Sequence, residues 1–257
     1  MIQLFAIFVV GTAGSGKSLF TGSFLEWLKA KDQNAITVNL DPGASYTPYN
    51  PDVDVRTNID VLEIMNEYRL GPNGALVMAA DQVASELDSI QEQIDELNPD
   101  YTIIDTSGQM ELFAFRASGP YIAKEIVADN KIVLYMFDSI FSNNPFNYVS
   151  NMFLAAAVNN RFNLPQVHVL SKTDILPPSK VKEILDWSSR SGKLEMALES
   201  SGEATRMLLN RDVLRALGRL NLTFSLLPIS STNNGGFTNL FAVLQRIFMG
   251  GEEIIKG

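Results

Sequence analysis

The chain of 257 residues contains no cysteine, a single histidine and two tryptophans. Without cysteine the protein has no disulfide, no thiolate metal site and no cysteine nucleophile. A reducing compartment fits that absence, and we expect the protein to be cytoplasmic. No stretch approaches 18 consecutive apolar residues, so the sequence predicts no membrane-spanning helix. The apolar segment Met1–Val10 lacks the basic region of a signal peptide and is followed at once by a glycine-rich loop. Both features favour a buried strand over a signal peptide.

Positive charge is also scarce, because 20 Lys and Arg face 29 Asp and Glu, for a formal net charge of −9. Nucleic acids and anionic membranes bind clustered Lys and Arg, so we expect direct binding to neither. Hydrophobic residues make up 46% of the chain and charged residues 19%, which excludes wholesale disorder. With no clean linker and no repeat, we predict a single domain over residues 1–257, with a polar helical insertion at about 177–217.

Short apolar runs alternate with helix-length segments. The expected strands are Leu4–Val10, Ala35–Leu40, Tyr101–Asp105, Lys131–Phe137, Gln166–Leu170 and Thr223–Pro228. The expected helices are Lys17–Lys31, Thr57–Leu70, Gln82–Leu97, Phe115–Asp129, Tyr148–Arg161 and Thr238–Phe248. Most of the strands lack alternation of apolar and polar residues, so both faces of the sheet are expected to be covered. The pattern predicts an α/β fold, a three-layer α/β/α sandwich with a mostly parallel sheet and helical insertions.

The segment Gly11–Ser18 matches G-x-x-x-x-G-K-[ST] in full and lies between an expected strand and an expected helix. In such a P-loop the glycines let backbone N–H groups wrap a phosphate, and the helix aims its positive end at it. Lys17 can reach the β- and γ-phosphates, and the Ser18 hydroxyl can coordinate Mg²⁺. The segment therefore predicts a P-loop NTPase that binds a nucleoside di- or triphosphate. The predicted phosphate-binding residues are Gly11, Ala13, Gly14, Ser15, Gly16, Lys17 and Ser18.

Two acidic residues end expected strands. The strand Tyr101–Asp105 resembles a Walker B strand, whose terminal carboxylate holds Mg²⁺ directly or through water. The following residues complete a D-x-x-G-Q pattern, in which the Gly108 N–H donates to the γ-phosphate and Gln109 orients the attacking water. Asp41 follows the second strand, where a parallel sheet faces its ligand, although Asp41-Pro42-Gly43 is also typical of a plain turn. The predicted magnesium ligands are Ser18, Asp41 and Asp105, and the predicted catalytic residues so far are Lys17, Asp41 and Gln109.

A candidate base-binding segment follows the strand that ends at Leu170. Ser171-Lys172-Thr173-Asp174 resembles the guanine motif N-K-x-D, with Ser in place of Asn. Asp174 can accept hydrogen bonds from guanine N1–H and its exocyclic amine, whereas adenine offers neither donor in that geometry. The Lys172 stem is expected to cover one face of the base. Ser230 and Ser231 follow the last strand, where GTPases place a small residue whose backbone N–H meets guanine O6.

The tripeptide Gly71-Pro72-Asn73 by itself indicates only a turn. In order with the other motifs, it makes the chain resemble the GPN-loop GTPases in an archaeal-type version. The resemblance covers almost the whole chain, including Pro48-Tyr49 and Asp54-Val55-Arg56, and departs from the family at Ser107 and Ser171. It implies a Mg²⁺-dependent enzyme that hydrolyses GTP to GDP.

The same resemblance implies a homodimer in which the GPN loop of residues 71–73 reaches the nucleotide of the neighbouring subunit. Asn73 adds a neutral amide that can donate to a γ-phosphate oxygen, so it joins the predicted catalytic residues. By analogy with eukaryotic relatives, the resemblance implies a protein client, with assembly of RNA polymerase as the example.

Other interpretations remain open. A small-molecule phosphotransferase would share the P-loop and the acids but would lack a guanine site, and a scaffold would bind GTP without catalysis. His168 lies in an expected buried strand and is interpreted as a core residue. Arg56 and Arg116 are weak candidates for an arginine finger. One apolar stripe is interpreted as core-facing, with a dimer seam as the alternative, and consists of Val83, Leu87, Ile90, Ile94 and Leu97.

Overall fold

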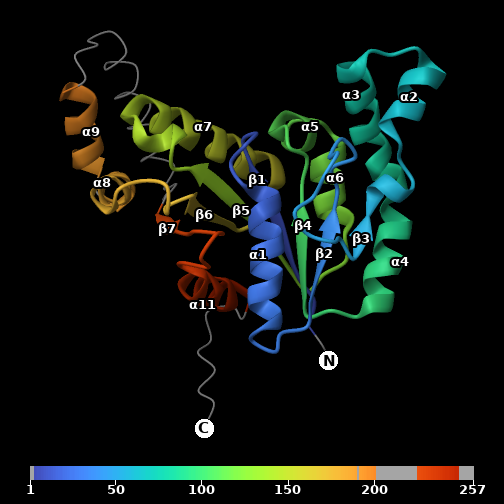
Figure 1. Ribbon diagram of the computed structural model, residues 1–257, viewed down its shortest axis with the longest axis horizontal. Coiled ribbons are helices and arrows are strands. Elements are labelled where there is room, and N and C mark those ends of the chain that lie inside the picture. The colour runs from blue at the N-terminus through green and yellow to red at the C-terminus, as the bar shows by residue number, and fades with distance from the viewer. Residues whose placement is uncertain (1–2, 190, 201–224, 249–257) are drawn as a thin grey trace.

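The computed structural model describes residues 3–189, 191–200 and 225–248. A seven-stranded sheet lies at its centre, with every pair of neighbouring strands parallel, in the order β3-β2-β4-β1-β5-β6-β7 (Figure 1). The strands are β1 (Phe5–Gly11), β2 (Ala35–Asn39), β3 (Val53–Asp54), β4 (Tyr101–Asp105), β5 (Asn130–Asp138), β6 (Gln166–Ser171) and β7 (Leu226–Pro228). The last expected strand, Thr223–Pro228, begins two residues outside the described part of the chain.

Helices cover both faces of this sheet, which confirms the three-layer α/β/α fold. They are α1 (Lys17–Lys29), α2 (Val61–Tyr68), α3 (Pro72–Gln82), α4 (Leu87–Leu97), α5 (Met110–Ala114), α6 (Ser118–Glu125), α7 (Pro145–Phe162), α8 (Pro178–Ser189), α9 (Ser191–Ser200) and α11 (Phe237–Phe248). Strand β1 shows why two layers are needed, because its side chains alternate between two cores. Ile7 and Val9 pack with α1 and α11, whereas Phe8 and Val10 pack with α4, α6 and α7.

Several expected helices have different bounds in the structure. The expected helix Thr57–Leu70 is the shorter α2, because the Asp60 carboxylate accepts hydrogen bonds from the N–H groups of Leu62 and Glu63 and caps it there. The expected helix Phe115–Asp129 is the shorter α6, and α5, which was not expected, precedes it. The interpretation of the GPN loop as a turn is wrong, since Gly71 is the N-cap of α3 and Pro72 is its first residue.

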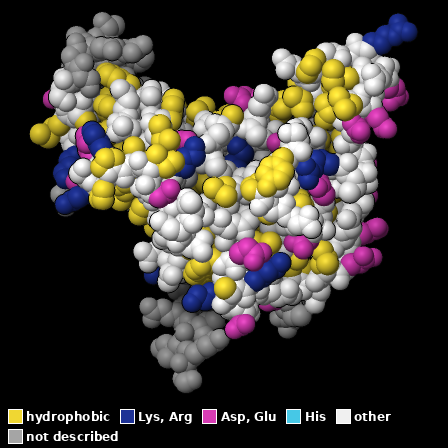
Figure 2. Space-filling view, in the orientation of Figure 1, with side chains coloured by type: hydrophobic (Ala, Val, Ile, Leu, Met, Phe, Trp, Pro, Cys, Tyr) yellow, Lys and Arg dark blue, Asp and Glu magenta, His cyan; other side chains and the backbone are white. Residues whose placement is uncertain are grey.

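Helices α8 and α9 lie within the predicted polar insertion, and its residues 201–217 lie outside the described part. Figure 1 shows α2 and α3 on one side of the molecule and α8 and α9 on the other, at the same end. The space-filling view is hollowed between these two lobes (Figure 2). None of the described helices combines the length and apolar character that crossing a membrane requires.

The strand register brings the ends of three strands together. Asn39 of β2 and Val9 of β1 are both paired with Asp105 of β4. The loops that follow β1, β2 and β4 therefore meet at one edge of the sheet, and these loops contain the P-loop, Asp41 and Gly108.

Candidate functional site

The P-loop connects β1 to α1 in a tight turn. Gly14 and Gly16 have φ angles of 76° and 95°, a left-handed conformation that side chains with a Cβ rarely adopt. The Ser15 N–H donates to the Thr12 carbonyl across this turn, at 3.1 Å. Gly16 is the N-cap of α1 and offers no side chain to its first turn, so the free N–H groups of that turn point toward the loop. The turn therefore has the backbone form that wraps a phosphate.

The Lys17 ammonium joins the P-loop to the loop after β4. Its Nζ donates to the carbonyl oxygens of Gly11, Thr12 and Gly108 at 3.0, 3.1 and 3.2 Å. Burial lowers the pKa of Lys17, and the carboxylates of Asp105, Asp41 and Glu111 oppose that effect. Lys17 is thus a buried cation at the point where the P-loop and the two predicted acids converge.

Asp41 holds the loop after β4 through its backbone. Its Oδ2 accepts the Gly108 N–H at 2.7 Å, and its Oδ1 accepts the Gly43 N–H at 3.0 Å. In this structure the Gly108 N–H therefore donates to Asp41, whereas the sequence analysis assigns that N–H to a γ-phosphate. Gln109, the residue after Gly108, is exposed and is the N-cap of α5.

Asp105 is 1% exposed at the end of β4. Its Oδ2 accepts a hydrogen bond from the Tyr49 hydroxyl at 3.0 Å, while its Oδ1 is buried and accepts none. Burial raises the pKa of Asp105 to about 6, against the hydroxyls of Ser18 and Tyr49 and the charge of Lys17, which lower it. A buried acceptor without a partner, next to Ser18, is a feature that a bound cation satisfies.

The Ser171–Asp174 segment lies against the P-loop. The Ser171 hydroxyl is buried and donates to the carbonyl oxygens of Ser15 and Phe137 at 2.8 and 3.2 Å. The Lys172 ammonium donates to the Gly14 carbonyl and to Asp138 Oδ2, the latter at 2.7 Å. Ser171 therefore fastens the P-loop to β6, and Lys172 lies along the outside of the same loop.

Asp174 is exposed at the mouth of a small pocket of about 120 Å³. Its Oδ2 accepts a hydrogen bond from the Thr232 hydroxyl at 3.0 Å. The hydroxyls of Ser230, first, and of Thr232 lower the pKa of Asp174. The structure thus brings the two predicted base-binding segments together beside the P-loop. The pocket is lined by Ser15, Gly16, Leu19, Ser171, Lys172, Asp174, Ile175, Ser231 and Thr232.

The GPN loop lies apart from these residues. Gly71, Pro72 and Asn73 are exposed at the N-terminus of α3, and within the described ranges no hydrogen bond joins them to the P-loop. Farther along α3, Leu76 lies against Gly43, so the helix contacts the loop that contains Asp41. The structure therefore places the GPN loop on the surface of the protein, beside the site but outside it.

Three residues picked out in the sequence have structural roles here. The Arg56 guanidinium pairs with Asp54, and the Arg116 guanidinium pairs with Asp81, so neither arginine is a free finger. His168 is buried in β6, as expected for a core residue. Of the apolar stripe, all but the exposed Leu97 face the core.

Two residues of the site, Asp138 and Tyr49, received no role in the sequence analysis. Asp138 ends β5 and holds the Lys172 ammonium, and the sequence signal was the same strand-terminal acid that identified Asp105. Tyr49 contacts Asp105 from the connection between β2 and β3, a distance of 56 residues along the chain. No spacing rule predicts that contact.

Comparisons with known proteins agree with this geometry. A family model described as "Conserved hypothetical ATP binding protein" matches residues 9–250. The GPN-loop GTPase QQT2 of Arabidopsis thaliana is 31% identical over 207 residues, which are 79% of this chain and 53% of that protein. GPN-loop GTPase 3 of Saccharomyces cerevisiae is 27% identical over 248 residues, 94% of this chain and 91% of that protein. The chain thus spans about half the length of one relative and nearly all of the other.

A solved structure gives the same result for the fold. The crystal structure of a GTPase in apo form from Pyrococcus abyssi superposes with a TM-score of 0.84 at 29% sequence identity, covering 96% of this chain and 98% of that one.

Proposed function

Since the chain belongs to the GPN-loop GTPase family, we propose that it binds GTP and hydrolyses it to GDP and phosphate at the P-loop edge of the sheet. The observation that supports this most strongly is the convergence of three separate segments on one P-loop. Lys17 bonds the loop after β4, Asp41 bonds the same loop, and Ser171 bonds Ser15. A phosphate site, two acids and a base pocket therefore lie side by side.

The residues present fit a magnesium ion that arrives with the nucleotide. Mg²⁺ is usually bound by one or two carboxylates together with substrate phosphates and waters. The described residues hold no group of three or more His, Cys, Asp or Glu side chains that could bind a metal ion. Ser18 and the buried, unpartnered Oδ1 of Asp105 would hold the ion, with Asp41 nearby. The ion would supply positive charge to the β- and γ-phosphates.

The chain's own groups would stabilise the charge that develops during in-line attack by water. Backbone N–H groups of the P-loop and the Lys17 ammonium would donate to phosphate oxygens, in place of their present contacts. Release of the Gly108 N–H by Asp41 would free a donor for the γ-phosphate and a carboxylate for the water. Gln109, at the start of α5, would orient that water from the other side.

Base recognition would come from Asp174 and Lys172. The pocket beside Asp174 has an acceptor at its mouth, and guanine offers two N–H donors where adenine offers none. The description of the matched family model names ATP and not GTP, so base preference is the first property to measure.

The test is competition for binding followed by phosphate release. GTP and ATP are competed against a fluorescent GDP analogue, and phosphate is then measured with Mg²⁺ and with excess EDTA. We expect GTP to compete far better than ATP, and hydrolysis to require Mg²⁺ and to vanish in Lys17→Ala. Equal competition by ATP would refute the guanine assignment, and GTP turnover in EDTA would refute the metal site.

The same assays separate the alternatives. A phosphotransferase would release phosphate only slowly without an acceptor molecule. A scaffold would bind GTP with the same preference but would produce no phosphate in a single-turnover reaction with excess enzyme.

We further propose that the protein acts as a homodimer in which the GPN loop serves the neighbouring active site. The loop is exposed, and apolar side chains of α2 next to it are exposed too, with Leu62 67% and Tyr68 47% accessible. Figure 2 shows hydrophobic side chains gathered over this lobe. The exposed Asn73 amide thus lies beside an exposed apolar surface, as expected if this surface binds a second subunit and the amide reaches that subunit's nucleotide.

Mixing two inactive variants tests this arrangement. Lys17→Ala lacks a functional P-loop, and Asn73→Ala lacks the GPN amide, whose loss should cost about 10²–10³ in rate. If the loop acts across the dimer, random mixing makes about half of the dimers mixed, each with one intact site, and about a quarter of wild-type activity returns. With subunit exchange verified, no return of activity would refute the trans arrangement and leave GTP hydrolysis untouched.

A GTP-dependent dimer of this kind would act as a switch on a protein client, with assembly of a complex such as RNA polymerase as one candidate process. Affinity capture from native lysate with GTP- and GDP-loaded protein tests this proposal. A client should be retained by one nucleotide form and released by the other, and retention that ignores the nucleotide would refute the switch.

A further inference from the structure

The Tyr49 hydroxyl reaches a carboxylate that the proposed function assigns to magnesium. It donates to Asp105 Oδ2 at 3.0 Å, and the Asp105 side chain is almost wholly buried. The other oxygen of that carboxylate, Oδ1, accepts no hydrogen bond. One oxygen of Asp105 is therefore fixed by the protein, and the other remains as an acceptor.

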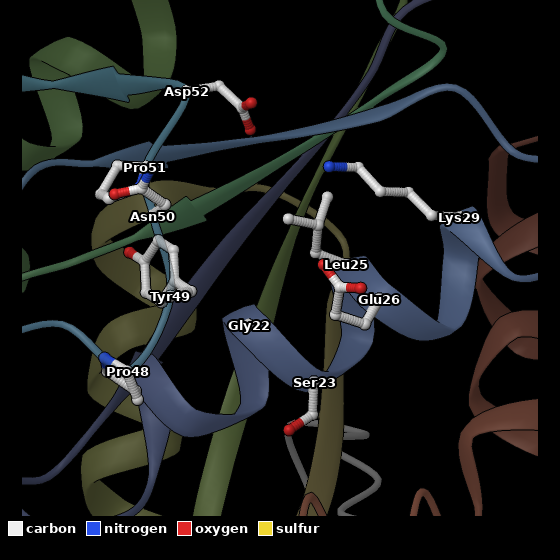
Figure 3. A pocket seen from close by; sticks show the side chains of 10 residues that line it. All are labelled: Gly22, Ser23, Leu25, Glu26, Lys29, Pro48, Tyr49, Asn50, Pro51 and Asp52. Carbon is white, nitrogen blue, oxygen red and sulfur yellow. The ribbon is translucent and has the colours of Figure 1, made fainter.

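Tyr49 is seated directly on α1. A Cβ atom placed on Gly22 would lie 2.8 Å from the Tyr49 Cβ, which is closer than real Cβ atoms approach. Only the absence of a side chain at Gly22 lets the tyrosine approach this near. Gly22 lies four residues after Ser18, so the two residues share one face of the helix. Figure 3 shows Tyr49 and Gly22 opposite each other in the wall of a pocket of about 460 Å³.

Arg56 holds the segment that contains Tyr49 through hydrogen bonds. The Arg56 guanidinium is held by Asp54, and it donates to the Ala44 carbonyl at 2.8 Å and to the Thr47 hydroxyl at 3.4 Å. The Thr47 hydroxyl in turn donates to the Tyr49 carbonyl at 3.0 Å. The backbone at Tyr49 is thus fixed by a chain of hydrogen bonds, and its ring is fixed by contact with α1.

We propose that Tyr49 is a positioning residue for Asp105: its hydroxyl holds Oδ2 so that Oδ1 is presented to the magnesium ion of the bound nucleotide or to its water. This inference rests on the proposed function. Partners that orient a metal-binding carboxylate usually change metal affinity by about 10- to 100-fold when they are removed. Tyr49 meets that description, because it is rigidly held and touches the carboxylate itself.

The test measures binding rather than turnover. A fluorescent, non-hydrolysable GTP analogue is titrated at a series of Mg²⁺ concentrations and in EDTA. Tyr49→Phe removes one oxygen atom, and we expect the Mg²⁺ concentration for half-maximal tight binding to rise about 10- to 100-fold. Affinity in EDTA should stay within about twofold of wild type, because without the metal the carboxylate has no ion to hold.

Tyr148→Phe is the matched control. Tyr148 is a fully buried tyrosine, it packs against Phe137 and Trp187, and its hydroxyl has no hydrogen-bond partner. Its Mg²⁺ dependence should equal that of wild type. Melting temperatures of both variants should be recorded, so that a folding defect is not taken for a metal effect.

Gly22→Ala provides a second, independent variant. The new methyl group must displace Tyr49, so the Mg²⁺ requirement should rise in the same direction. In Gly22→Ala/Tyr49→Phe the rise should be no larger than in Tyr49→Phe alone, since the hydroxyl is already absent. An additive rise would refute the role of Gly22 as the seat of Tyr49.

The possible results separate the positioning role of Tyr49 from the proposed Mg²⁺-dependent binding of GTP. Wild type that binds the analogue in a Mg²⁺-dependent way, together with a Tyr49→Phe variant of unchanged Mg²⁺ dependence, overturns the positioning role and leaves the proposed function standing. Wild type whose binding ignores Mg²⁺ overturns the magnesium site itself. A rise in Tyr49→Phe that Tyr148→Phe does not share supports the proposal.

Discussion

Replacing Asp105 with Asn should make the protein more stable and inactive at the same time. The pKa of Asp105 is raised to about 6 by burial, from an ordinary value of 3.8, in spite of the hydroxyls of Ser18 and Tyr49 and the ammonium of Lys17. Above pH 6 the carboxylate is ionised in both the folded and the unfolded chain, and burial then destabilises the folded state. At about 1.36 kcal/mol for each pKa unit, the cost is about 3 kcal/mol. Asparagine has nearly the same shape and no charge to bury.

The pH dependence identifies the cause of this stabilisation. As pH falls from 6 to 4, wild-type Asp105 takes up its proton in the folded state first, so its destabilising effect fades. The gain in Asp105→Asn should therefore be about 3 kcal/mol at pH 7 and close to zero below pH 4. Urea unfolding in EDTA without nucleotide measures it across this range. A difference between the two proteins that does not change with pH, or a less stable Asp105→Asn at pH 7, would refute the reasoning.

Three further predictions concern His168, Asp174 and Ser171. Burial lowers the pKa of His168 to about 4, so the unfolded chain binds a proton first and this residue lowers stability by about 3 kcal/mol as pH drops from 6.5 to 4. Because protonation of Asp105 raises stability over the same range, the loss is measured by urea unfolding as the difference between wild type and His168→Gln, and a difference that does not change with pH would contradict it. Asp174→Asn should lower the affinity for GTP by about 10²–10⁴-fold and favour binding of xanthosine triphosphate in the fluorescent competition assay. An unchanged affinity for GTP would contradict this prediction. Ser171→Ala deprives two carbonyls of a buried donor, so the free energy of unfolding should fall by about 1–3 kcal/mol; an unchanged urea midpoint would show that the P-loop does not depend on this bond.

The layers of the fold could be predicted from the sequence because the buried strands carry a strong local signal. Strands such as β1, β4 and β5 are almost wholly apolar, as a sheet covered on both faces requires. Strand β3 was missed because two residues, Val53 and Asp54, carry no periodicity at all. The start of α3 was missed although its signal was present, since a proline that follows an N-cap residue is typical of a helix start as well as of a turn.

The site could be predicted only where its chemistry is contiguous in the sequence. The P-loop and the Ser171–Asp174 segment are such stretches, and the structure brings both to one small pocket. The contact of Tyr49 with Asp105 depends on how the connection between β2 and β3 folds back over α1. The Asp41 contact with Gly108 depends on strand order, which places β2 beside β4. Pairings of this kind come from tertiary packing, and short-range patterns do not contain them.

Helix α3 shows how a surface loop can respond to the nucleotide site without touching it. Near its start, Leu76 lies against Gly43 in the loop that contains Asp41. Near its end, Asp81 pairs with Arg116, which follows the loop of Gly108 and α5. Release of Gly108 by Asp41 would change the Leu76 contact directly, because Gly43 lies in the loop of Asp41, and it would reach the Asp81–Arg116 pair through α5, which begins two residues after Gly108. Because α3 is a rigid helix that contacts both regions, its exposed first turn, which is the GPN loop, would move when Asp41 releases the Gly108 N–H.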